Sequence, residues 1–531
     1  MEQTFEMVAK TLKGLEEVLA EELRSMGALN VQPGLRMVSF EGDLAMMYRA
    51  NLCSHTALSI LRPIYKFMAS DPDSLYEMVK EYDWGSILSV SKTFSIDTTV
   101  HSDSFTHSRF VTYRVKDAIV DWFKDRFGEE KRPGVRLSDA DVMINVHIDG
   151  DRVTLSLNSS GESLHKRGWR VASTEAPINE VLAAGIILKT GWRGETPLVD
   201  PMCGSGTFLI EAALIGAGIK PGSFRKGWAF ENWRDYDAEL FEKVLNEGEG
   251  PRELPYMIYG ADISPKAISI AERNILAAGV DEYINLRVRP LQQWEEAPAE
   301  GKPGVIVTNP PYGERLNPED IENLYRMLGT KLKRVFLGYH SWIISSNEDC
   351  LAHIGLTPSI KEELQNGGID CQLREYISFE GSKSDFRKNG GVIKEDRPVR
   401  SAKDRIARKS DAEWRKDARE KGMGGRRARK NDEPRRGPEK RTPLSEKYRP
   451  KKGGFARAEE RRRKFKEETA RDGESEAEIL LQRRRNIHAL KSLGESPKTP
   501  SIPASEGPFM RTRRRWKRPD SDNSGNTVNE E

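Results

Sequence analysis

The first 165 residues show apolar patterns of two kinds, which together predict an α+β region. The run at 4–11 (TFEMVAKT) alternates apolar and polar residues with the period of a strand. The same holds for 93–100 and for two runs within 141–161, which the turn residues DGD join as a hairpin. The stretch at 108–128 has the period of an amphipathic helix. A further helix is expected at 14–28, with one apolar face: Leu15, Val18, Leu19, Leu23 and Met26.

From about residue 180 the pattern changes to helices that alternate with short strands. The strands are apolar on both faces, which is typical of parallel strands covered by helices on both sides. We therefore expect an α/β domain with a doubly wound, Rossmann-like sheet. The expected helices are 179–192, 206–219 and 265–279, and the expected strands are 197–201, 256–264, 304–312 and 336–346.

After residue 385 apolar residues become sparse and the balance of charge is reversed. Residues 386–531 carry 43 Lys and Arg against 25 Asp and Glu, whereas the preceding residues carry 42 against 57. Such a segment cannot bury enough apolar surface to offset the entropy of ordering, so we expect a disordered basic tail. The predicted organisation is an N-terminal region at 1–165, a doubly wound domain at 166–385 and the tail at 386–531.

Charge and composition also restrict the partner and the compartment. A basic tail on an acidic body predicts a polyanionic partner, most simply nucleic acid, and a merely solubilising tail is the alternative. The four cysteines are scattered without a C-x-x-C spacing, so neither a metal site nor a disulfide framework is indicated. No apolar run approaches the roughly 18 residues of a membrane span, and the N-terminus has no signal-peptide core. We expect a soluble, cytoplasmic, monomeric protein that uses no metal.

The stretch LVDPMCGSGTFLIEAAL at 198–214 predicts a loop that binds a nucleotide-like cofactor. A strand delivers Asp200, and Gly204 and Gly206 permit a tight turn with close backbone approach. The helix that begins near Thr207 directs its N–H groups toward the same place. The spacing departs from G-x-G-x-x-G, and glycines that serve only strand–helix packing are the alternative.

A second acidic residue ends the next strand, in YGADISPKAI at 259–268. In such sheets a carboxylate at this place accepts hydrogen bonds from ribose hydroxyls. A lone carboxylate here is more often a helix cap. However, Ser264 already supplies a capping hydroxyl and Pro265 suits the first helical turn, which leaves Asp262 for a ligand.

The stretch VTNPPYGERL at 307–316 predicts a rigid loop that holds an amino nitrogen. Its two prolines cannot continue a strand. The side-chain oxygen of Asn309 and a carbonyl fixed by Pro310 can accept the two N–H groups of an exocyclic amine, while Tyr312 stacks on the base. The alternative is a proline turn in which Asn309 is a local cap.

These motifs resemble the class I S-adenosylmethionine-dependent methyltransferases that modify amino nitrogens, whose mark is (D/N)-P-P-(Y/F/W). The chain is more similar still to the THUMP-domain RNA guanine-N2 methyltransferases, in the branch that acts on bacterial 23S ribosomal RNA. The resemblance extends from about 50 to 380. It rests on RVKDAIVDWF, LSLNSSGESLHKRGWR, APINEVLAAGIILKTGW, DPMCGSGTFLIEAAL, GADISPKAISIAERN, TNPPYGERL and LQNGGIDCQLREY.

The resemblance implies a ferredoxin-like and THUMP half before the methyltransferase domain, and a role for each motif residue. Asn309, Pro310 and Tyr312 would hold the target amine, and Lys166, Arg167 and Arg170 would contribute to RNA capture, an ordinary solvated linker being the alternative. The residues implied to bind S-adenosylmethionine are Asp200, Met202, Cys203, Gly204, Ser205, Gly206, Thr207, Asp262, Ile263 and Asn309.

Two departures from the family pattern stand out. An acidic residue that commonly contacts adenine is missing, because RVRPLQQW has Pro290 near that place. Some members carry a second methyltransferase domain, but 386–531 contain no second glycine loop and no second PPY, so we expect a single activity.

The expected reaction is direct methyl transfer from the cofactor sulfonium to guanine N2, without a covalent enzyme intermediate, because the donor is already activated. Cys203 has no partner histidine that would make it a nucleophile. The rivals are a tRNA guanine-N2 methyltransferase, a DNA adenine-N6 or protein-glutamine methyltransferase, and a non-catalytic RNA-binding ribosome assembly factor. The THUMP-like half argues against the DNA and protein substrates.

Overall fold

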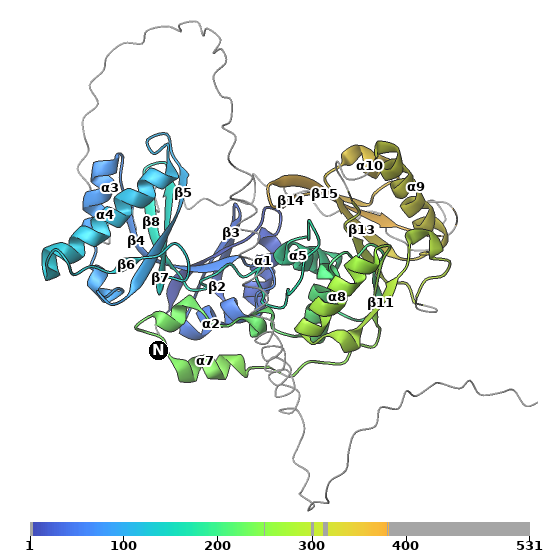
Figure 1. The fold of residues 1–531 in the computed structure, drawn as a ribbon, viewed down its shortest axis with the longest axis horizontal. Coiled ribbons are helices and arrows are strands. Elements are labelled where there is room, and N and C mark those ends of the chain that lie inside the picture. Colours follow the sequence, from blue (N-terminus) through green and yellow to red (C-terminus); the bar gives the residue numbers. More distant parts are fainter. Residues whose placement is uncertain (1–3, 249, 299–301, 312–316, 380, 382–531) are drawn as a thin grey trace, which may run out of the picture.

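Two β-sheets, each with its own helices, form the two halves of the molecule (Figure 1). The computed structural model describes residues 4–248, 250–298, 302–311, 317–379 and 381. The predicted tail at 386–531 and Tyr312 lie outside the described residues, so their predictions are untested. The α+β half followed by a doubly wound half confirms the predicted fold class.

The N-terminal half contains an eight-stranded sheet in the order β2-β3-β1-β4-β8-β7-β5-β6. The pairing is antiparallel except where β5 runs parallel to β6 and β7. The predicted hairpin at 141–161 is confirmed, because β7 pairs antiparallel with β8 from Ile144↔Leu157 to Asp149↔Arg152. The elements are β1 (Phe5–Lys10), α1 (Glu16–Ser25), β2 (Leu29–Gly34), β3 (Met37–Gly42), α2 (Leu44–Cys53), β4 (Ser59–Met68), α3 (Pro72–Glu81), β5 (Thr93–His101), α4 (Ser108–Phe127), β6 (Gly134–Val135), β7 (Val142–Asp149) and β8 (Arg152–Asn158).

The second half contains a seven-stranded sheet in the order β11-β10-β9-β12-β13-β15-β14. Strands β9 to β13 are parallel, and β14 and β15 add an antiparallel hairpin at one edge. The strand order reverses at β9, which lies between β10 and β12, and ligands of open α/β sheets bind at the carboxyl ends of such strands. The strands are β9 (Leu198–Asp200), β10 (Ile258–Asp262), β11 (Ile284–Val288), β12 (Val305–Thr308), β13 (His340–Ser345), β14 (Ile360–Asn366) and β15 (Ile369–Ile377).

Helices of the second half begin and end where their sequences contain caps. The side chain of Asn179 accepts the N–H groups of Val181 and Leu182, and Ser264 accepts that of Ala267. The left-handed glycines Gly191 and Gly279 end the same two helices. The helices are α5 (Glu180–Thr190), α6 (Thr207–Ala217), α7 (Ala238–Leu245), α8 (Pro265–Ala278), α9 (Pro318–Arg334) and α10 (Glu348–Ala352).

The segment at 221–247 belongs to the second half in sequence but packs on the first. Its aromatic residues from Trp228 onward join the core of the N-terminal half, and the ring centroids of Phe230 and Tyr48 lie 4.6 Å apart. The backbone N–H of Asp237 donates to the hydroxyl of Tyr48 at 3.0 Å. In Figure 1, α7 lies beside α2. It is far from the seven-stranded sheet, to which the next strand in the sequence, β10, belongs. The segment therefore connects the two halves by packing, and the division at 165/166 stays a prediction from the sequence.

In the part of the chain that the structure describes, no helix is both long and apolar enough to span a bilayer. Within the same residues, no three His, Cys, Asp or Glu side chains gather closely enough to hold a metal ion.

Candidate active site

The loop after β9 lies at the point where the strand order reverses. Asp200 ends the strand, and Gly204 and Gly206 follow with φ of +54° and +82°, a region that favours glycine. The N–H of Cys203 donates to the carbonyl of Ala261 on β10 at 2.9 Å, which fixes the loop against the neighbouring strand. Helix α6 begins directly afterwards, so its unpaired N–H groups point to the same edge.

The two glycines serve different purposes. A Cβ at Gly206 would lie 3.2 Å from the Cβ of Ala271, so this glycine allows α8 to pack closely on the loop. A Cβ at Gly204 would meet nothing within 4 Å. The backbone of Gly204 therefore borders open space, as a loop that a cofactor approaches closely requires.

Asp262 accepts hydrogen bonds from the loop and from its own turn, whereas the sequence suggested that its carboxylate is left for a ligand. Its Oδ2 accepts the N–H of Gly204 at 3.0 Å, and its Oδ1 accepts that of Ser264 at 2.8 Å. The predicted cap is nevertheless present, because the hydroxyl of Ser264 accepts the N–H of Ala267. Each carboxylate oxygen retains a lone pair, so Asp262 can still accept from a ligand.

Asp200 is almost completely buried, with 2% of its surface exposed. Its Oδ1 accepts the hydroxyl of Thr308 at 2.8 Å and the N–H of Met202 at 3.1 Å. Burial raises the pKa of this carboxyl to about 7, and these two hydrogen bonds oppose the rise only in part. The bond from Thr308, the last residue of β12, joins this strand to β9, where the strand order reverses.

The stretch that follows β12 presents an acceptor to the same edge. The side-chain Oδ1 of Asn309 is buried and has no hydrogen-bond partner among the described residues. A buried amide oxygen without a donor costs free energy, so a ligand that supplies a donor would be stabilised here. Pro310 is buried beside it, as expected for a rigid wall.

The other predicted cofactor residues at this edge of the sheet differ in exposure and in hydrogen-bond partners. Ile263 is 68% exposed next to Asp262, where it offers an apolar surface to a ligand. Cys203 is buried, and burial raises the pKa of its thiol well above the usual value. A thiol that stays protonated is a poor nucleophile, which agrees with direct transfer. The hydroxyls of Ser205 and Thr207 are bound by Arg170.

The three predicted RNA-binding residues have separate surroundings. Lys166 is exposed and pairs only with Glu162 among the described residues. Arg167 is 2% exposed and forms an internal ion pair with Glu211 at 3.2 Å, so the structure does not present it to RNA. Arg170 is mostly buried against the cofactor loop. Their shared sequence motif could not distinguish these environments, because Glu211, Ser205 and Thr207, which bind the two arginines, lie more than 30 residues away.

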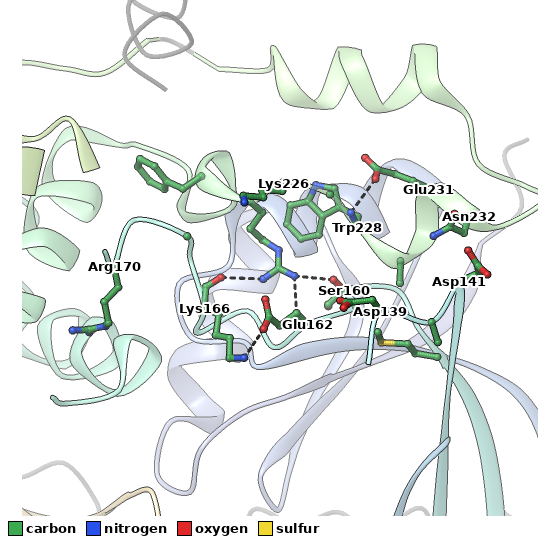
Figure 2. Close-up of a pocket in the computed structure, with 18 of the residues that line it drawn as sticks. Asp139, Asp141, Ser160, Glu162, Lys166, Arg170, Lys226, Trp228, Glu231 and Asn232 are labelled. Carbon is green, nitrogen blue, oxygen red and sulfur yellow. Dashed lines mark hydrogen bonds and ion pairs between the residues drawn. The ribbon is translucent and has the colours of Figure 1, made fainter. Parts of the chain in front are cut away.

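A cleft of about 760 Å³ is lined by residues of the N-terminal half between 139 and 162, by the linker between 166 and 171, and by the segment at 224–232. Figure 2 shows Arg170 at one end and Asp141 of the N-terminal half at the other, with Trp228 between. Arg225 crosses the cleft wall and donates to the carbonyls of Ser160, Glu162, Ser163 and Lys166. These four hydrogen bonds make the guanidinium a structural brace, and burial lowers the pKa of Arg225 to about 10.

Three protein-family models match the chain, in the order that its two halves suggest. A ferredoxin-like domain model named for RlmL matches 6–61, and a THUMP domain model matches 69–158. The model of RMKL-like methyltransferase domains matches 167–375.

Individual relatives give the same picture. A ribosomal RNA large subunit methyltransferase K/L of Syntrophotalea carbinolica is 41% identical over 388 residues, 71% of this chain, and the chain spans only 54% of that relative. A putative RNA methyltransferase of Synechocystis is 37% identical over 371 residues, 69% of this chain and 95% of its own length. The crystal structure of SMU.472, a putative methyltransferase complexed with S-adenosylhomocysteine, is 29% identical with a TM-score of 0.64, covering 72% of this chain and all of its own.

Proposed function

The chain belongs to the THUMP-containing family of RMKL-like methyltransferases, and from this membership we propose that it transfers a methyl group from S-adenosylmethionine to N2 of a guanine in RNA. The observation that carries this proposal is the unpartnered acceptor of Asn309, at the strand end hydrogen-bonded to the cofactor loop through Thr308 and Asp200. The side-chain oxygen of Asn309 can accept an N–H group of an exocyclic amine.

The loop residues fit the proposed cofactor. S-adenosylmethionine would supply an activated methyl group on a sulfonium. Open space beside Gly204 allows close approach, Asp262 retains acceptor capacity for ribose hydroxyls, and exposed Ile263 offers an apolar surface to the adenine. Asp200, which lacks a compensating cation among the described residues, suits a ligand with positive charge. The full set we propose adds Met202, Cys203, Ser205, Gly206 and Thr207.

Asn309 and Pro310 would position the reacting nitrogen. Two acceptors, the Asn309 Oδ1 and the Pro310 carbonyl, would take the two N–H groups and leave the nitrogen lone pair available for attack. Tyr312 would stack on the base once it leaves its helix. The chain needs no strong base, because the alkylated nitrogen is acidic and its proton can pass to water.

The substrate that we propose is ribosomal RNA of the large subunit. The THUMP match and the large-subunit methyltransferase K/L of Syntrophotalea carbinolica support this substrate. The chain spans only 54% of that relative, so the match does not extend to the whole activity of the relative. Lys166 remains an exposed cation for RNA between the two halves. We propose a cytoplasmic monomer with an RNA-capturing region at 1–165 and a catalytic domain at 166–385.

Transfer of tritium from labelled S-adenosylmethionine tests the proposal. Unmodified large-subunit rRNA, tRNA and duplex DNA would be compared as acceptors, and the product nucleoside identified. Asn309→Ala should reduce transfer by roughly 100-fold or more, since one lost transition-state contact commonly has this effect. Asn323→Ala, an exposed residue of α9, is the matched control and should retain activity.

Each outcome decides between the rivals. N2-methylguanine in tRNA alone would replace the ribosomal substrate, and N6-methyladenine in DNA would overturn the reaction itself. Tight binding of rRNA by the wild type without transfer to any acceptor would instead favour a non-catalytic assembly factor.

A further inference from the structure

The linker at 164–172, which joins the two halves, contacts the cofactor loop at Ser205 and Thr207. Its Arg170 has 19% of its side chain exposed and uses three N–H groups inward. Nε donates to Glu180 at 2.6 Å, Nη1 to the hydroxyl of Ser205 at 3.0 Å and Nη2 to that of Thr207 at 2.9 Å. Both hydroxyls belong to the turn into α6, so one guanidinium holds the loop and the start of α5 together.

Asn274 of α8 joins the same linker to the same loop. Its Oδ1 accepts the N–H groups of Val171 and Ala172, each at 3.0 Å. Its Nδ2 donates to the carbonyl of Ala172 at 2.9 Å and to that of Ser205 at 3.0 Å. The residue is fully buried and uses both donors and two acceptor positions, so its side chain has a single arrangement.

Arg167 fixes the other end of the linker. It donates to the carbonyl of His55 in the N-terminal half and to both oxygens of Glu211, which lies one helical turn beyond Thr207 on α6. The linker is therefore attached at two points of α6 and its preceding loop. Cys203 and Gly204 hold the strand end of the loop against β10, and the attachments of the linker hold its other end, at Ser205 and Thr207.

We infer that Arg170 and Asn274 are positioning residues for the cofactor loop, and that Arg170 acts through Ser205 and Thr207 and does not bind RNA. The inference rests on the proposed cofactor but does not require that methyl transfer occur. Only Arg can make these contacts together, because its planar fork reaches two hydroxyls and a carboxylate at once. A lysine would keep the charge beside Glu180 and lose the fork.

Two substitutions separate positioning from RNA contact. Arg170→Lys keeps a cation that could still bind phosphate, and Arg170→Met removes it. If Arg170 positions the loop, both should weaken S-adenosylhomocysteine binding in calorimetry by roughly 10-fold or more, the loss expected for a hydrogen bond to a charged group. Affinity for ribosomal RNA should change less than about twofold, and its salt dependence should stay the same. Arg326→Lys, an exposed surface arginine of α9, is the matched control.

The opposite pattern would overturn the inference. If Arg170→Lys binds S-adenosylhomocysteine as the wild type does while Arg170→Met loses RNA affinity and salt dependence, then Arg170 is an RNA contact. Both ligands are measured without turnover, so a wild type that binds them but transfers no methyl group would refute the proposed function and leave this inference standing. A wild type that does not bind S-adenosylhomocysteine would refute both.

A double-mutant cycle distinguishes positioning from a general loss of fold. Ser205→Ala with Thr207→Val removes the two hydroxyls at little cost to packing. In that background Arg170→Lys should weaken S-adenosylhomocysteine binding by less than about threefold, because the contacts that it acts through are gone. If Arg170→Lys weakens S-adenosylhomocysteine binding by the same factor in this background as in the wild type, Arg170 does not act through the two hydroxyls.

Discussion

Two buried carboxylates on the same strand–helix unit have opposite electrostatic surroundings. Glu211, on α6 at the junction of the two halves, is fully buried between Arg167 and His55. Burial alone would raise its pKa, but the charge and hydrogen bonds of Arg167 and His55 lower it below the usual value. Asp200, at the carboxyl edge of the sheet, is nearly as buried and has only hydrogen bonds, so burial raises its pKa to about 7.

The difference identifies which carboxylate serves the fold and which awaits a ligand. A buried charge that has its counter-ion inside the protein contributes to a fixed structure. A buried carboxyl without a cation lowers stability as soon as it ionises, and such groups gather at functional sites. Among the described residues no ion pair to Asp200 is present, and a cationic cofactor would complete its surroundings.

The largest expected effect is at the junction. Glu211→Gln removes one charge and leaves Arg167 buried without its counter-ion, so we expect a loss of about 3–5 kcal/mol in the free energy of unfolding. Urea denaturation of the full chain measures it. The double variant Arg167→Met with Glu211→Leu removes both charges and should recover most of this loss. Equal stability of the single variant and the wild type would refute a structural role for the pair.

The second prediction concerns the pH dependence of the ligand-free protein. Because the folded pKa of Asp200 is raised from 3.8 to about 7, its contribution to stability is fully present below the unfolded value and is lost as pH rises through the folded value. Between these limits Asp200→Asn should gain roughly 1 kcal/mol per pH unit over the wild type. Glu211 has the opposite sign, since its contribution is lost as pH falls through its lowered pKa.

Urea unfolding of wild type and Asp200→Asn at several pH values within this window makes the measurement. The amide keeps an oxygen for Thr308 and Met202, so the fold has the same donors in both proteins. Two stability profiles that run parallel across the window would show that the carboxyl of Asp200 does not titrate as proposed.

The smallest expected effect is at an uncharged contact of the junction. Tyr48→Phe removes the hydroxyl that accepts the N–H of Asp237, and we expect a loss of about 1 kcal/mol, the usual value for one hydrogen bond. Tyr236→Phe, on the same aromatic cluster, is the control. A larger loss for Tyr236→Phe than for Tyr48→Phe would contradict the assignment of that bond.

Most of the candidate edge could be predicted from local sequence. Asp200, Asp262 and Asn309 each follow a short apolar strand, and parallel strands bring their carboxyl ends to one edge. The predicted helix cap at Ser264 is present, and the helix expected from 179 begins at Glu180. These inferences need only neighbouring residues, because strand periodicity and capping are short-range properties.

The roles of the linker arginines and of the segment at 221–247 could not be predicted in this way. Arg167 and Arg170 lie in one short motif, and both look like surface cations that suit RNA. Their burial depends on Glu211, Ser205 and Thr207, all more than 30 residues away in sequence. The packing of 221–247 on the first half likewise depends on aromatic partners in α2.

The sequence by itself determined the doubly wound half, the glycine loop and the acceptor after β12, because each depends on the period and conformation of adjacent residues. Only the tertiary structure decided which buried carboxylates are paired with a cation inside the protein and which remain for a ligand. Glu211 and Asp200 are 11 residues apart, and neither residue type nor local pattern separates them. Their pKa values differ because Arg167 comes from the linker to neutralise Glu211, whereas Asp200 is left to the open edge.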